Sequence, residues 1–488
     1  MSLHESVLCS TLPSQGTGTL TLHDLQTGTP LALFKHTSSS SRCVAVIPTR
    51  AGLGGVAIAA QVDKAVLNVY SFQKDQVLLK CVLPERLACT AVDKRGLLCA
   101  GGTAQGRIYL WEKLASGALC NVWDAHYRQV TTLAFSHDGD ALVSGSDDAG
   151  ISVWSVSRLL DGDAQNTPVP LLNFSDHTLP ITDVVVGIGR FPSCRLVSAS
   201  VDCSVKLWDF STNTLLTTFL LPRPISHVVF DATERLIFAV ANGPEGDIYQ
   251  VNLLRRRDDH VEAVGGAGVN DIIRLGMENK NEQDPASGKI SVGEEVTVLS
   301  LSLTSSLLLA GTVAGFVHVY DVHSHQRLRS ISVGAKITNV YAMLRPPDLF
   351  GHTSLVAREG SIPVRPIAPL QRTRATEWEG KEVGVLLAPF GKETAESLIN
   401  YPSDELQRDF ALLLHTSPSN VREEPATATN ARVAELEAEI SHLRGQLGRA
   451  KGVNDAMWEA MVRKVVAQEK EKNNADEGRI KKKGKKDH

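Results

Sequence analysis

Three consecutive residues carry the side chains of a nucleophilic relay. Ser136, His137 and Asp138 supply a hydroxyl, an imidazole and a carboxylate, the groups that activate a serine for attack on a carbonyl carbon. Neighbouring residues cannot place these three groups in the line that proton transfer requires. The sequence Ser-His-Asp-Gly lies between two strand-like segments and is instead typical of a turn.

Two further pairs could act as acid and base or as metal ligands. Asp147 and Asp148 are adjacent carboxylates, and His323 and His325 are separated by one residue. The histidines follow a strand-like segment in a turn, and Asp148 fits a structural set described below. The glycine-rich segments lack the lysine or acidic residue of a nucleotide-binding loop, and His-Glu-x-x-His is absent from the sequence. We therefore expect no catalytic, cofactor or metal site and no small-molecule substrate, and we predict that the chain is not an enzyme.

The composition is that of an ordinary globular protein without a strong charge bias. The 488 residues are 43% hydrophobic and 21% charged, with a formal net charge of -4, which argues against a chain-wide attraction to nucleic acid or membranes. The first residues lack the pattern of a signal peptide, and no run of ~18 apolar residues predicts a membrane span. The cysteines form no C-x-x-C pair and are expected to be reduced core residues of an intracellular protein: Cys9, Cys43, Cys81, Cys89, Cys99, Cys120, Cys194 and Cys203.

One phrase of the sequence occurs twice. ALVSGSDDAGISVW, at 141–154, is nearly repeated as RLVSASVDCSVKLWD, at 195–209. Related segments recur at a period of about 40 to 45 residues once two insertions, 158–170 and 255–288, are removed. Each period contains short β-branched segments separated by Gly, Asp and Ser, which predicts strands and turns.

We interpret each period as one four-stranded antiparallel sheet. Such a sheet cannot bury both of its faces alone, so neighbouring sheets must stack, and a closed ring leaves no open end. Seven anchor strands mark the periods, with aromatic or polar residues at His23, Tyr70, Trp111, Trp154, Trp208, Tyr249 and Tyr320. The amino-terminal strands lack a complete sheet of their own, whereas strand-like sequence continues after the last period. The prediction is an all-β, seven-bladed β-propeller over 1–376, closed by strands from both termini.

The repeated phrase resembles the signature of the WD-repeat family. In that family a His before the first strand, a Ser or Thr in the second, an Asp in the turn and a Trp form a buried hydrogen-bonded set. Two repeats match it in full: His126, Ser144, Asp148 and Trp154, then His177, Ser198, Asp202 and Trp208. Buried polar groups need partners, which explains why these residue types recur together. Elsewhere Tyr replaces Trp at positions 70, 249 and 320, and no Asp precedes Trp111.

The sequence changes character after residue 376. Residues 377–430 are predicted to be a linker with a short docking helix near 404–415, and 473–488 a disordered basic tail. Between them, 431–472 is predicted to form α-helical coiled-coil segments, because apolar residues recur at three- and four-residue steps. The residues expected to pair these helices are Val433, Leu436, Ile440, Leu443, Leu447, Met457, Trp458 and Met461.

A lone helix of this kind is marginally stable in water, so its apolar side chains need a partner. We favour pairing with a second copy of the chain or with another helix; folding back on the propeller and disorder are the alternatives. The tail carries a lysine cluster typical of nuclear-import or nucleic-acid-contact sequences, although an ordinary solvated end has the same composition. Its members are Lys481, Lys482, Lys483, Lys485 and Lys486.

The arrangement as a whole resembles the pre-ribosomal-RNA-processing WD-repeat subunits of the nuclear Rix complex. The resemblance is carried by HYRQVTTLAFSHDGDALVSGSDDAGISVW, HTLPITDVVVG, SVDCSVKLWD, and GDIYQVNLL before a charged insertion, with the linker and coiled segment behind them. It implies a non-catalytic scaffold, without a cofactor, in the nucleoplasm and nucleolus. It also implies a homodimer formed through the C-terminal helices and assembly with Rix-type and Ipi-type helical-repeat subunits. The complex would bind pre-large ribosomal subunit particles, support removal of the internal transcribed spacer and help recruit a dynein-like remodelling ATPase.

Two other functions are compatible with the same fold. A WD-repeat chain could be a different adaptor, such as a ubiquitin-ligase substrate receptor or a chromatin-complex subunit. It could also be an enzyme that uses a propeller pocket, because a fold alone does not determine function.

Overall fold

The computed structural model describes the repeat region of the chain. The described residues are 4–12, 18–49, 53–112, 116–160, 167–257, 260–263, 271–275, 287–349, 364–365 and 367–373. They all belong to the first of two compact units, Met1–Pro389 and Phe390–His488. The helix predicted near 404–415, the coiled-coil residues of 431–472 and the basic tail at 473–488 lie outside the described residues. No helix within the described ranges is long and apolar enough to span a membrane.

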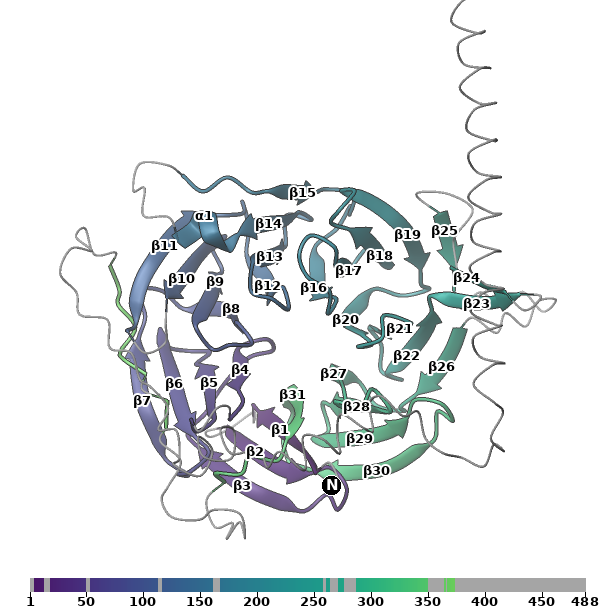
Figure 1. Ribbon diagram of the computed structural model, residues 1–488. Coiled ribbons are helices and arrows are strands. Elements are labelled where there is room, and N and C mark those ends of the chain that lie inside the picture. The colour runs from purple at the N-terminus through teal and green to yellow at the C-terminus, as the bar shows by residue number, and fades with distance from the viewer. Residues whose placement is uncertain are drawn as a thin grey trace, which may run out of the picture. The chain divides into compact units, whose positions relative to one another are not determined.

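Seven sheets stand around a common axis (Figure 1) and form the predicted seven-bladed β-propeller. Each blade has four antiparallel strands, with the first nearest the axis and the fourth at the rim. Strands in the second position are almost entirely buried, and β13 (Ala141–Ser146) is buried along its whole length, because a blade packs on each face. The rim strand of blade 7, β30 (Arg327–Ser332), is largely exposed.

The first four blades contain the following strands, given from the axis outward. Blade 1 comprises β31 (Ile337–Leu344), β1 (Glu5–Thr11), β2 (Thr19–Asp24) and β3 (Pro30–Lys35). Blade 2 comprises β4 (Val44–Ile47), β5 (Val56–Ala60), β6 (Val66–Ser71) and β7 (Val77–Val82). Blade 3 comprises β8 (Leu87–Val92), β9 (Leu98–Thr103), β10 (Arg107–Glu112) and β11 (Ala118–Asp124). Blade 4 comprises β12 (Val130–Phe135), β13, β14 (Ile151–Ser155) and β15 (Leu172–Phe174), with α1 (Val156–Leu160) after β14.

The remaining three blades include the long insertion. Blade 5 comprises β16 (Ile181–Val186), β17 (Arg195–Ser200), β18 (Ser204–Asp209) and β19 (Thr214–Leu220). Blade 6 comprises β20 (Ile225–Phe230), β21 (Leu236–Ala241), β22 (Asp247–Asn252) and β26 (Ser287–Ser291). Blade 7 comprises β27 (Val296–Leu301), β28 (Leu307–Thr312), β29 (Phe316–Asp321) and β30. Between β22 and β26, β23 (Leu254–Arg257) and β24 (His260–Ala263) form a hairpin, and β25 (Asp271–Arg274) pairs in parallel with β19 of the preceding blade.

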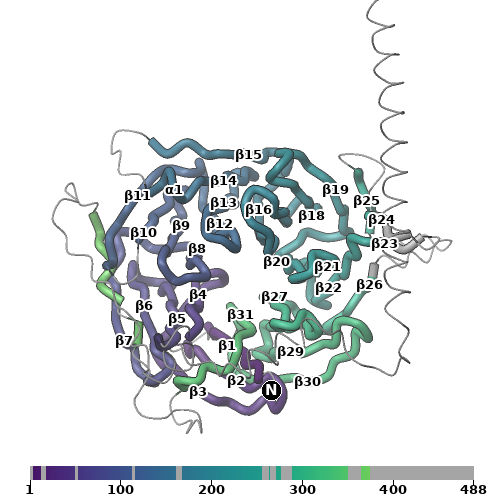
Figure 2. The backbone as a smooth tube through the Cα atoms, in the orientation of Figure 1, coloured from purple at the N-terminus to yellow at the C-terminus, as the bar shows by residue number. Residues whose placement is uncertain are grey.

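Strands from both ends of the described chain complete blade 1, as the sequence predicts. β1 pairs antiparallel with β31 from Glu5 opposite Leu344 to Thr11 opposite Ile337, with one register shift after Ser10. The backbone trace in Figure 2 places these two strands side by side at the inner part of the blade. The ring is therefore closed by backbone hydrogen bonds between residues far apart in sequence.

The hydrophobic core consists of seven clusters, one at each contact between neighbouring blades. Close approach of the blades requires small residues in the second strands. A Cβ atom built on Gly145 would lie 2.9 Å from the Ile181 side chain of the next blade, and one on Gly311 would lie 2.9 Å from Ile337. Ser, Gly and Ala in these strands are therefore a packing requirement of the ring.

A short segment beyond the closing strand returns to the rim at blades 2 and 3. We call residues 364–365 and 367–373 the rim segment; its backbone lies beside β7 and β11 in Figure 2. Leu370 is only 4% exposed and belongs to the cluster between blades 2 and 3. The Gln371 N–H donates to the Gly117 carbonyl at 2.7 Å, and Arg365 donates to the Arg95 carbonyl at 3.0 Å. The rim segment thus forms part of the propeller core.

Replacing Leu370 with Ala should lower the free energy of unfolding by about 2–4 kcal/mol, because it removes a buried side chain from a packed interface. Chemical denaturation of the full chain measures this change. Leu303→Ala is the matched control, since Leu303 is 47% exposed, and should change stability by less than about 0.5 kcal/mol. Equal effects of the two substitutions would show that the rim segment does not contribute to the core.

Candidate functional site

Blade 4 brings together the first predicted polar set. His126 Nδ1 lies 3.1 Å from Asp148 Oδ2, and His126 Nε2 lies 2.8 Å from Ser144 Oγ. A carboxylate can only accept, so Nδ1 carries a proton. The Trp154 indole N–H donates to the same Ser144 hydroxyl at 3.0 Å. The four side chains form one continuous network from the face of the blade to its middle.

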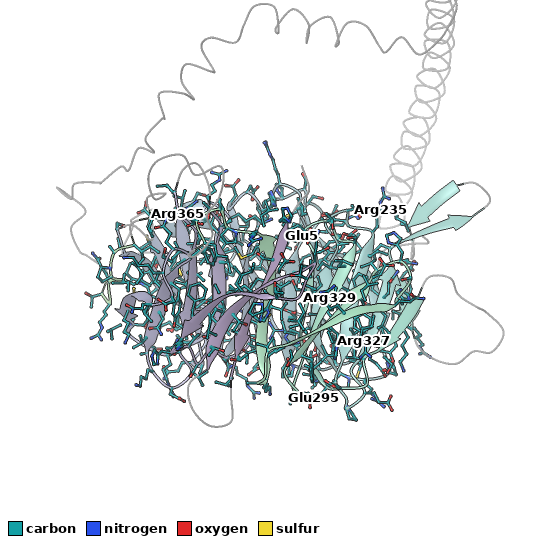
Figure 3. All side chains as sticks on the ribbon, turned by 90° about the horizontal axis from the view of Figure 1, so that it is seen from below. Glu5, Arg235, Glu295, Arg327, Arg329 and Arg365 are labelled. Atoms are coloured by element: carbon teal, nitrogen blue, oxygen red, sulfur yellow. The ribbon has the colours of Figure 1, made fainter. Side chains whose placement is uncertain are left out.

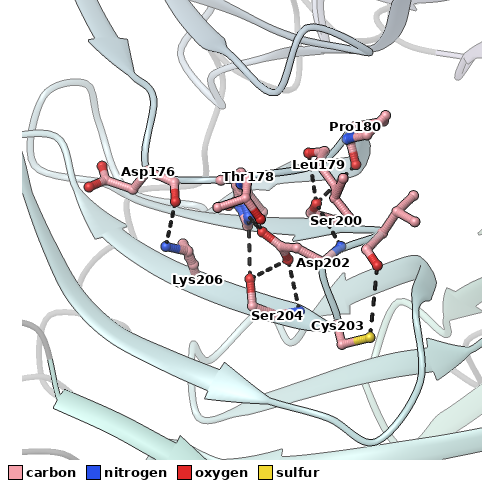
Figure 4. Close-up of polar contacts among 12 residues, drawn as sticks. Asp176, Thr178, Leu179, Pro180, Ser200, Asp202, Cys203, Ser204 and Lys206 are labelled. Atoms are coloured by element: carbon pink, nitrogen blue, oxygen red, sulfur yellow. Dashed lines mark hydrogen bonds and ion pairs between the residues drawn. The ribbon is translucent and has the colours of Figure 1, made fainter.

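Blade 5 repeats the arrangement with nearly the same distances. His177 lies 2.9 Å from Asp202 and 2.8 Å from Ser198, and the Trp208 indole N–H donates to Ser198 at 2.8 Å. Figure 4 shows the turn around Asp202, whose carboxylate also accepts the backbone N–H groups of Thr178 and Ser204. The network therefore holds the loop that enters the blade as well as the side chains within it.

Hydrogen bonding keeps both carboxylates ionised despite their burial. Burial by itself would raise the pKa of Asp148, but the hydrogen bond and charge of His126 and the N–H groups of Gly150 and Tyr127 outweigh it. The pKa of Asp148 therefore lies below its usual range. At Asp202 the same opposing effects, with an added hydroxyl from Ser204, lower the pKa further.

The other five blades lack the hydroxyl at the centre of the network. Strand register places Cys9, Ala59, Gly101, Ala239 and Ala310 at the position of Ser144. In blade 3 the Trp111 indole N–H instead donates to the Gln371 carbonyl of the rim segment at 3.0 Å. In blade 2 the Tyr70 hydroxyl hydrogen-bonds the Thr37 hydroxyl in the loop that leaves blade 1. Buried polar groups are thus satisfied by different partners in different blades.

The assignment of Tyr249 to the tryptophan position is wrong. Trp154 pairs with Leu142 and Trp208 with Leu196, and the corresponding pair in blade 6 is Val251 with Ile237. Tyr249 lies two residues earlier on β22 and faces the same cluster between blades 5 and 6. Because residues two apart share a face of a strand, the sequence pattern alone could not distinguish them.

Several of the side chains that could suggest catalysis have structural partners. The Ser136 hydroxyl donates to Asp138 at 2.6 Å, whereas His137 approaches Lys94 at 2.5 Å. His325 hydrogen-bonds Gln250 at 2.6 Å. Within the described ranges no three His, Cys, Asp or Glu side chains are grouped as metal ligands would be. The predicted helix-pairing residues Val433 to Met461 and tail lysines Lys481 to Lys486 lie outside those ranges.

Sequence analysis missed a charged contact that crosses the axis of the ring. Arg42, in the loop before β4 of blade 2, places its Nε 3.1 Å from Asp183 Oδ1 on β16 of blade 5. Its Nη2 also donates to the Ser226 carbonyl of blade 6 at 3.1 Å, and its backbone N–H donates to Asn339 on β31 at 2.7 Å. A local sequence pattern cannot pair residues from such distant blades. An alignment of the seven blades would, however, show that Arg42 occupies the position held by Thr131 in blade 4 and Thr297 in blade 7.

The two faces of the ring differ in the loops they present. In the edge-on view of Figure 3, Glu295 lies at the edge opposite Glu5, Arg235 and Arg365. Glu295 immediately precedes β27, so its face carries the loops that enter each blade. We call this the entry face; the loops held by His126 and His177 lie on it. The two His, Ser, Asp and Trp networks therefore hold loops on the entry face as well as the interiors of blades 4 and 5.

A family model supports the assignment of the two complete repeats. The model for the WD domain, G-beta repeat, matches residues 117–155 and 168–209, which contain the first three strands of blade 4 and of blade 5, each preceded by the last strand of the blade before it. These are the two blades with the full His, Ser, Asp and Trp network.

Individual proteins match much more of the chain. The pre-rRNA-processing protein IPI3 of Mycosarcoma maydis is 32% identical over 536 aligned residues, which cover 88% of this chain and 91% of that protein. WD repeat-containing protein 18 of Homo sapiens is 30% identical, covering 86% of this chain and 90% of the relative. The pre-rRNA-processing protein crb3/ipi3 of Schizosaccharomyces pombe is 27% identical, covering 91% and 96%. The similarity therefore extends well beyond the two repeats that the domain model detects.

Replacing Ser144 with Ala should lower the free energy of unfolding by about 2–3 kcal/mol, because it leaves the Trp154 N–H and His126 without their shared partner. Ser155→Ala is the control, since the Ser155 hydroxyl makes an exposed hydrogen bond with Ser157, and should have an effect below about 0.5 kcal/mol. Urea denaturation distinguishes the two. Matching midpoints for both variants would contradict a structural role for the network.

Acidification should destabilise the protein partly through Asp202. Its pKa is depressed in the folded state, so below the unfolded value of about 3.9 the unfolded chain binds more protons. The resulting stability is complete above about pH 4 and is lost as the pH falls towards the folded pKa. Asp202→Asn should be less stable than the parent at neutral pH but should lose less stability on acidification. Parallel denaturation curves of parent and variant across this range would refute the assignment.

Proposed function

Because the chain belongs to the WD-repeat family that includes pre-rRNA-processing protein IPI3 and WD repeat-containing protein 18, we propose that it supports pre-rRNA processing as a non-catalytic scaffold. The proposal assigns it to a nuclear complex that matures pre-large ribosomal subunits. The observation that carries it is similarity over 88% of the chain to a protein named for pre-rRNA processing.

The architecture supports a holding role through its rigidity. Seven inter-blade clusters and a ring closed by β1 and β31 fix the positions of the loops on both faces. The buried carboxylates of Asp148 and Asp202 make structural bonds with their histidines. A rigid platform can bind several partners at once without large rearrangement.

The proposal also covers the binding partners of the scaffold and the roles of its C-terminal segments. The scaffold binds Rix-type and Ipi-type helical-repeat subunits, contacts pre-large ribosomal subunit particles and helps recruit a dynein-like remodelling ATPase during internal-transcribed-spacer removal. Its residues at 431–472 pair two copies of the chain, with Leu436, Ile440, Leu443 and Leu447 in the contact. The lysine-rich end at 473–488 assists nuclear import or nucleic-acid contact. The heptad spacing and the lysine cluster support these assignments.

Affinity purification of the tagged full chain from nuclear extract tests the proposal. Recovery of large-subunit precursor RNA together with helical-repeat subunits and the remodelling ATPase is the expected result. Recovery of cullin adaptors or histones without ribosomal precursors would overturn it. Ser155→Ala serves as a control of unchanged stability. Ser144→Ala shows how much of the recovery is lost when the protein is destabilised without a change at its surface.

A deletion of residues 431–470 tests the pairing role separately. Sedimentation of the purified deletion variant should give the mass of a monomer, whereas the full chain should give that of a dimer. An unchanged mass would contradict self-association through this region but would leave the ribosomal role intact. Circular dichroism confirms that the variant retains its sheet content.

A further inference from the structure

A pocket of ≈ 440 Å³ opens at the mouth of the central channel. It is formed by residues from blades 2 to 6, among them Arg42, Asp147, Pro180, Val201 and His227. Its volume falls within the range of about 300–1,000 Å³ typical of ligand clefts. We call it the channel-mouth pocket.

The rim of the pocket carries a single carboxylate. In each blade the turn that follows the second strand on the entry face contains one residue equivalent to Asp147. Strand register places these at Leu12, Val62, Ala104, Asp147, Val201, Asn242 and Val313. Of these seven residues, Asp147, Val201 and Asn242 line the pocket. Asp147 is thus the one acidic residue among these seven equivalent positions; the other six are apolar or uncharged.

The positive charge in the pocket is already neutralised. Arg42 pairs with Asp183, whose side chain is 12% exposed, and it donates a further hydrogen bond to the Ser226 carbonyl. Burial lowers the pKa of His227 to about 3, so this imidazole is neutral at physiological pH. Asp147 consequently gives the pocket a net negative charge.

The Asp147 carboxylate has no hydrogen-bond or ion-pair partner among the described side chains. Arg128 is exposed and near enough to lower the pKa of Asp147, but burial and the adjacent Asp148 raise it more. Its neighbour Asp148 is committed to His126. The carboxylate is therefore partly withdrawn from water without a fixed counter-charge.

Two polar atoms in the pocket wall lack a partner. Thr131 Oγ1 donates across the blade contact to the Ile181 carbonyl at 2.7 Å, and Thr297 does the same to Ile337. At the equivalent place in blade 5, Thr182 Oγ1 is buried and has no hydrogen-bond partner within the described part of the chain, and neither does His227 Nδ1. Both atoms lie beneath the pocket surface, so they do not contact a bound group directly.

A fully exposed aromatic ring stands in the loop that borders the pocket. Tyr127 is 98% exposed, and its backbone N–H is held by Asp148 at 3.2 Å. Gln129, two residues further along the same loop, lines the pocket. Exposed aromatic residues on rigid backbone are frequent anchors of protein interfaces.

We propose that the channel-mouth pocket binds a lysine or arginine side chain from an extended segment of a partner protein. The apolar stem of that side chain packs against Ala88, Pro180 and Val201, and its cationic head is held by Asp147. This division of a long side chain into an apolar stem and a charged tip matches the lining. Tyr127 contacts the residues that flank the inserted side chain. The assignment does not depend on the ribosomal role.

An acidic side chain would be disfavoured in the same pocket. Its charge would lie beside Asp147, and the charge of Arg42 is already balanced by Asp183. A neutral apolar side chain would fill the pocket but would leave the carboxylate without a partner. The geometry therefore selects for positive charge.

Binding of short blocked peptides to the full chain tests the proposal. The probes are acetylated and amidated Ser-Gly-Xaa-Gly-Ser peptides in which Xaa is arginine, lysine, norleucine or glutamate, titrated by calorimetry at low ionic strength. The arginine and lysine peptides should bind at least about tenfold more tightly than the other two. Tighter binding of the glutamate peptide, or no preference among the four, would overturn the proposal.

Substitutions locate the site. Asp147→Asn should weaken the arginine peptide by about tenfold while leaving the midpoint of thermal unfolding unchanged, because its carboxylate makes no structural hydrogen bond in the described chain. Asp176→Asn is the matched control, since Asp176 is an exposed acid on the same face outside the pocket, and should retain full affinity. Tyr127→Ala should also weaken binding. Unchanged affinity of Asp147→Asn, or an equal loss in Asp176→Asn, would place any peptide binding elsewhere and refute the assignment.

Discussion

The antiparallel pairing of β1 with β31 is the constraint on which the rest of the molecule depends. Every blade is buried on two faces only if the ring is closed, and this pairing joins the ends of the described repeat region. Without it, the cluster between blades 7 and 1 would lose Val7 and Cys9, and the cluster between blades 1 and 2 would lose Met343. Asn339, on the closing strand, bonds Ser10, the Ser40 carbonyl and the Arg42 backbone N–H. The closing seam is therefore continuous with the charged contact that crosses the channel.

Apolar packing contributes to the stability of every blade, whereas the complete polar network contributes to that of only two described blades. Each of the seven contacts between blades contains a hydrophobic cluster, but only blades 4 and 5 carry the complete His, Ser, Asp and Trp set among the described residues. Since a buried hydrogen bond adds only about 1 kcal/mol net, apolar burial alone can maintain the other blades. Once a buried indole is present, however, it needs an acceptor. In blade 3 the rim segment supplies that acceptor to Trp111 and fills the adjoining cluster with Leu370.

The sequence was most informative where a local pattern determines structure. Alternating β-branched segments and a regular period predicted seven blades and closure by both ends, because strand propensity and the need to cover each sheet are properties of short segments and their number. The contacts that it did not reveal depend on register or on distant residues. Tyr249 was misplaced because Val251 faces the same cluster. The partner of Trp111 is a backbone carbonyl far along the chain, and the pairing of Arg42 with Asp183 crosses the ring.

Hydrogen exchange of the full chain tests ring closure most directly. If closure by β1 and β31 holds the propeller together, amides in both strands should exchange only through global unfolding, at rates matching the buried second strands such as β13. Peptides from both sides of the seam should therefore acquire deuterium together with the core of blade 4. Exchange at β1 and β31 that is much faster than at β13 would show that the seam opens independently, and it would contradict a ring that depends on this pairing.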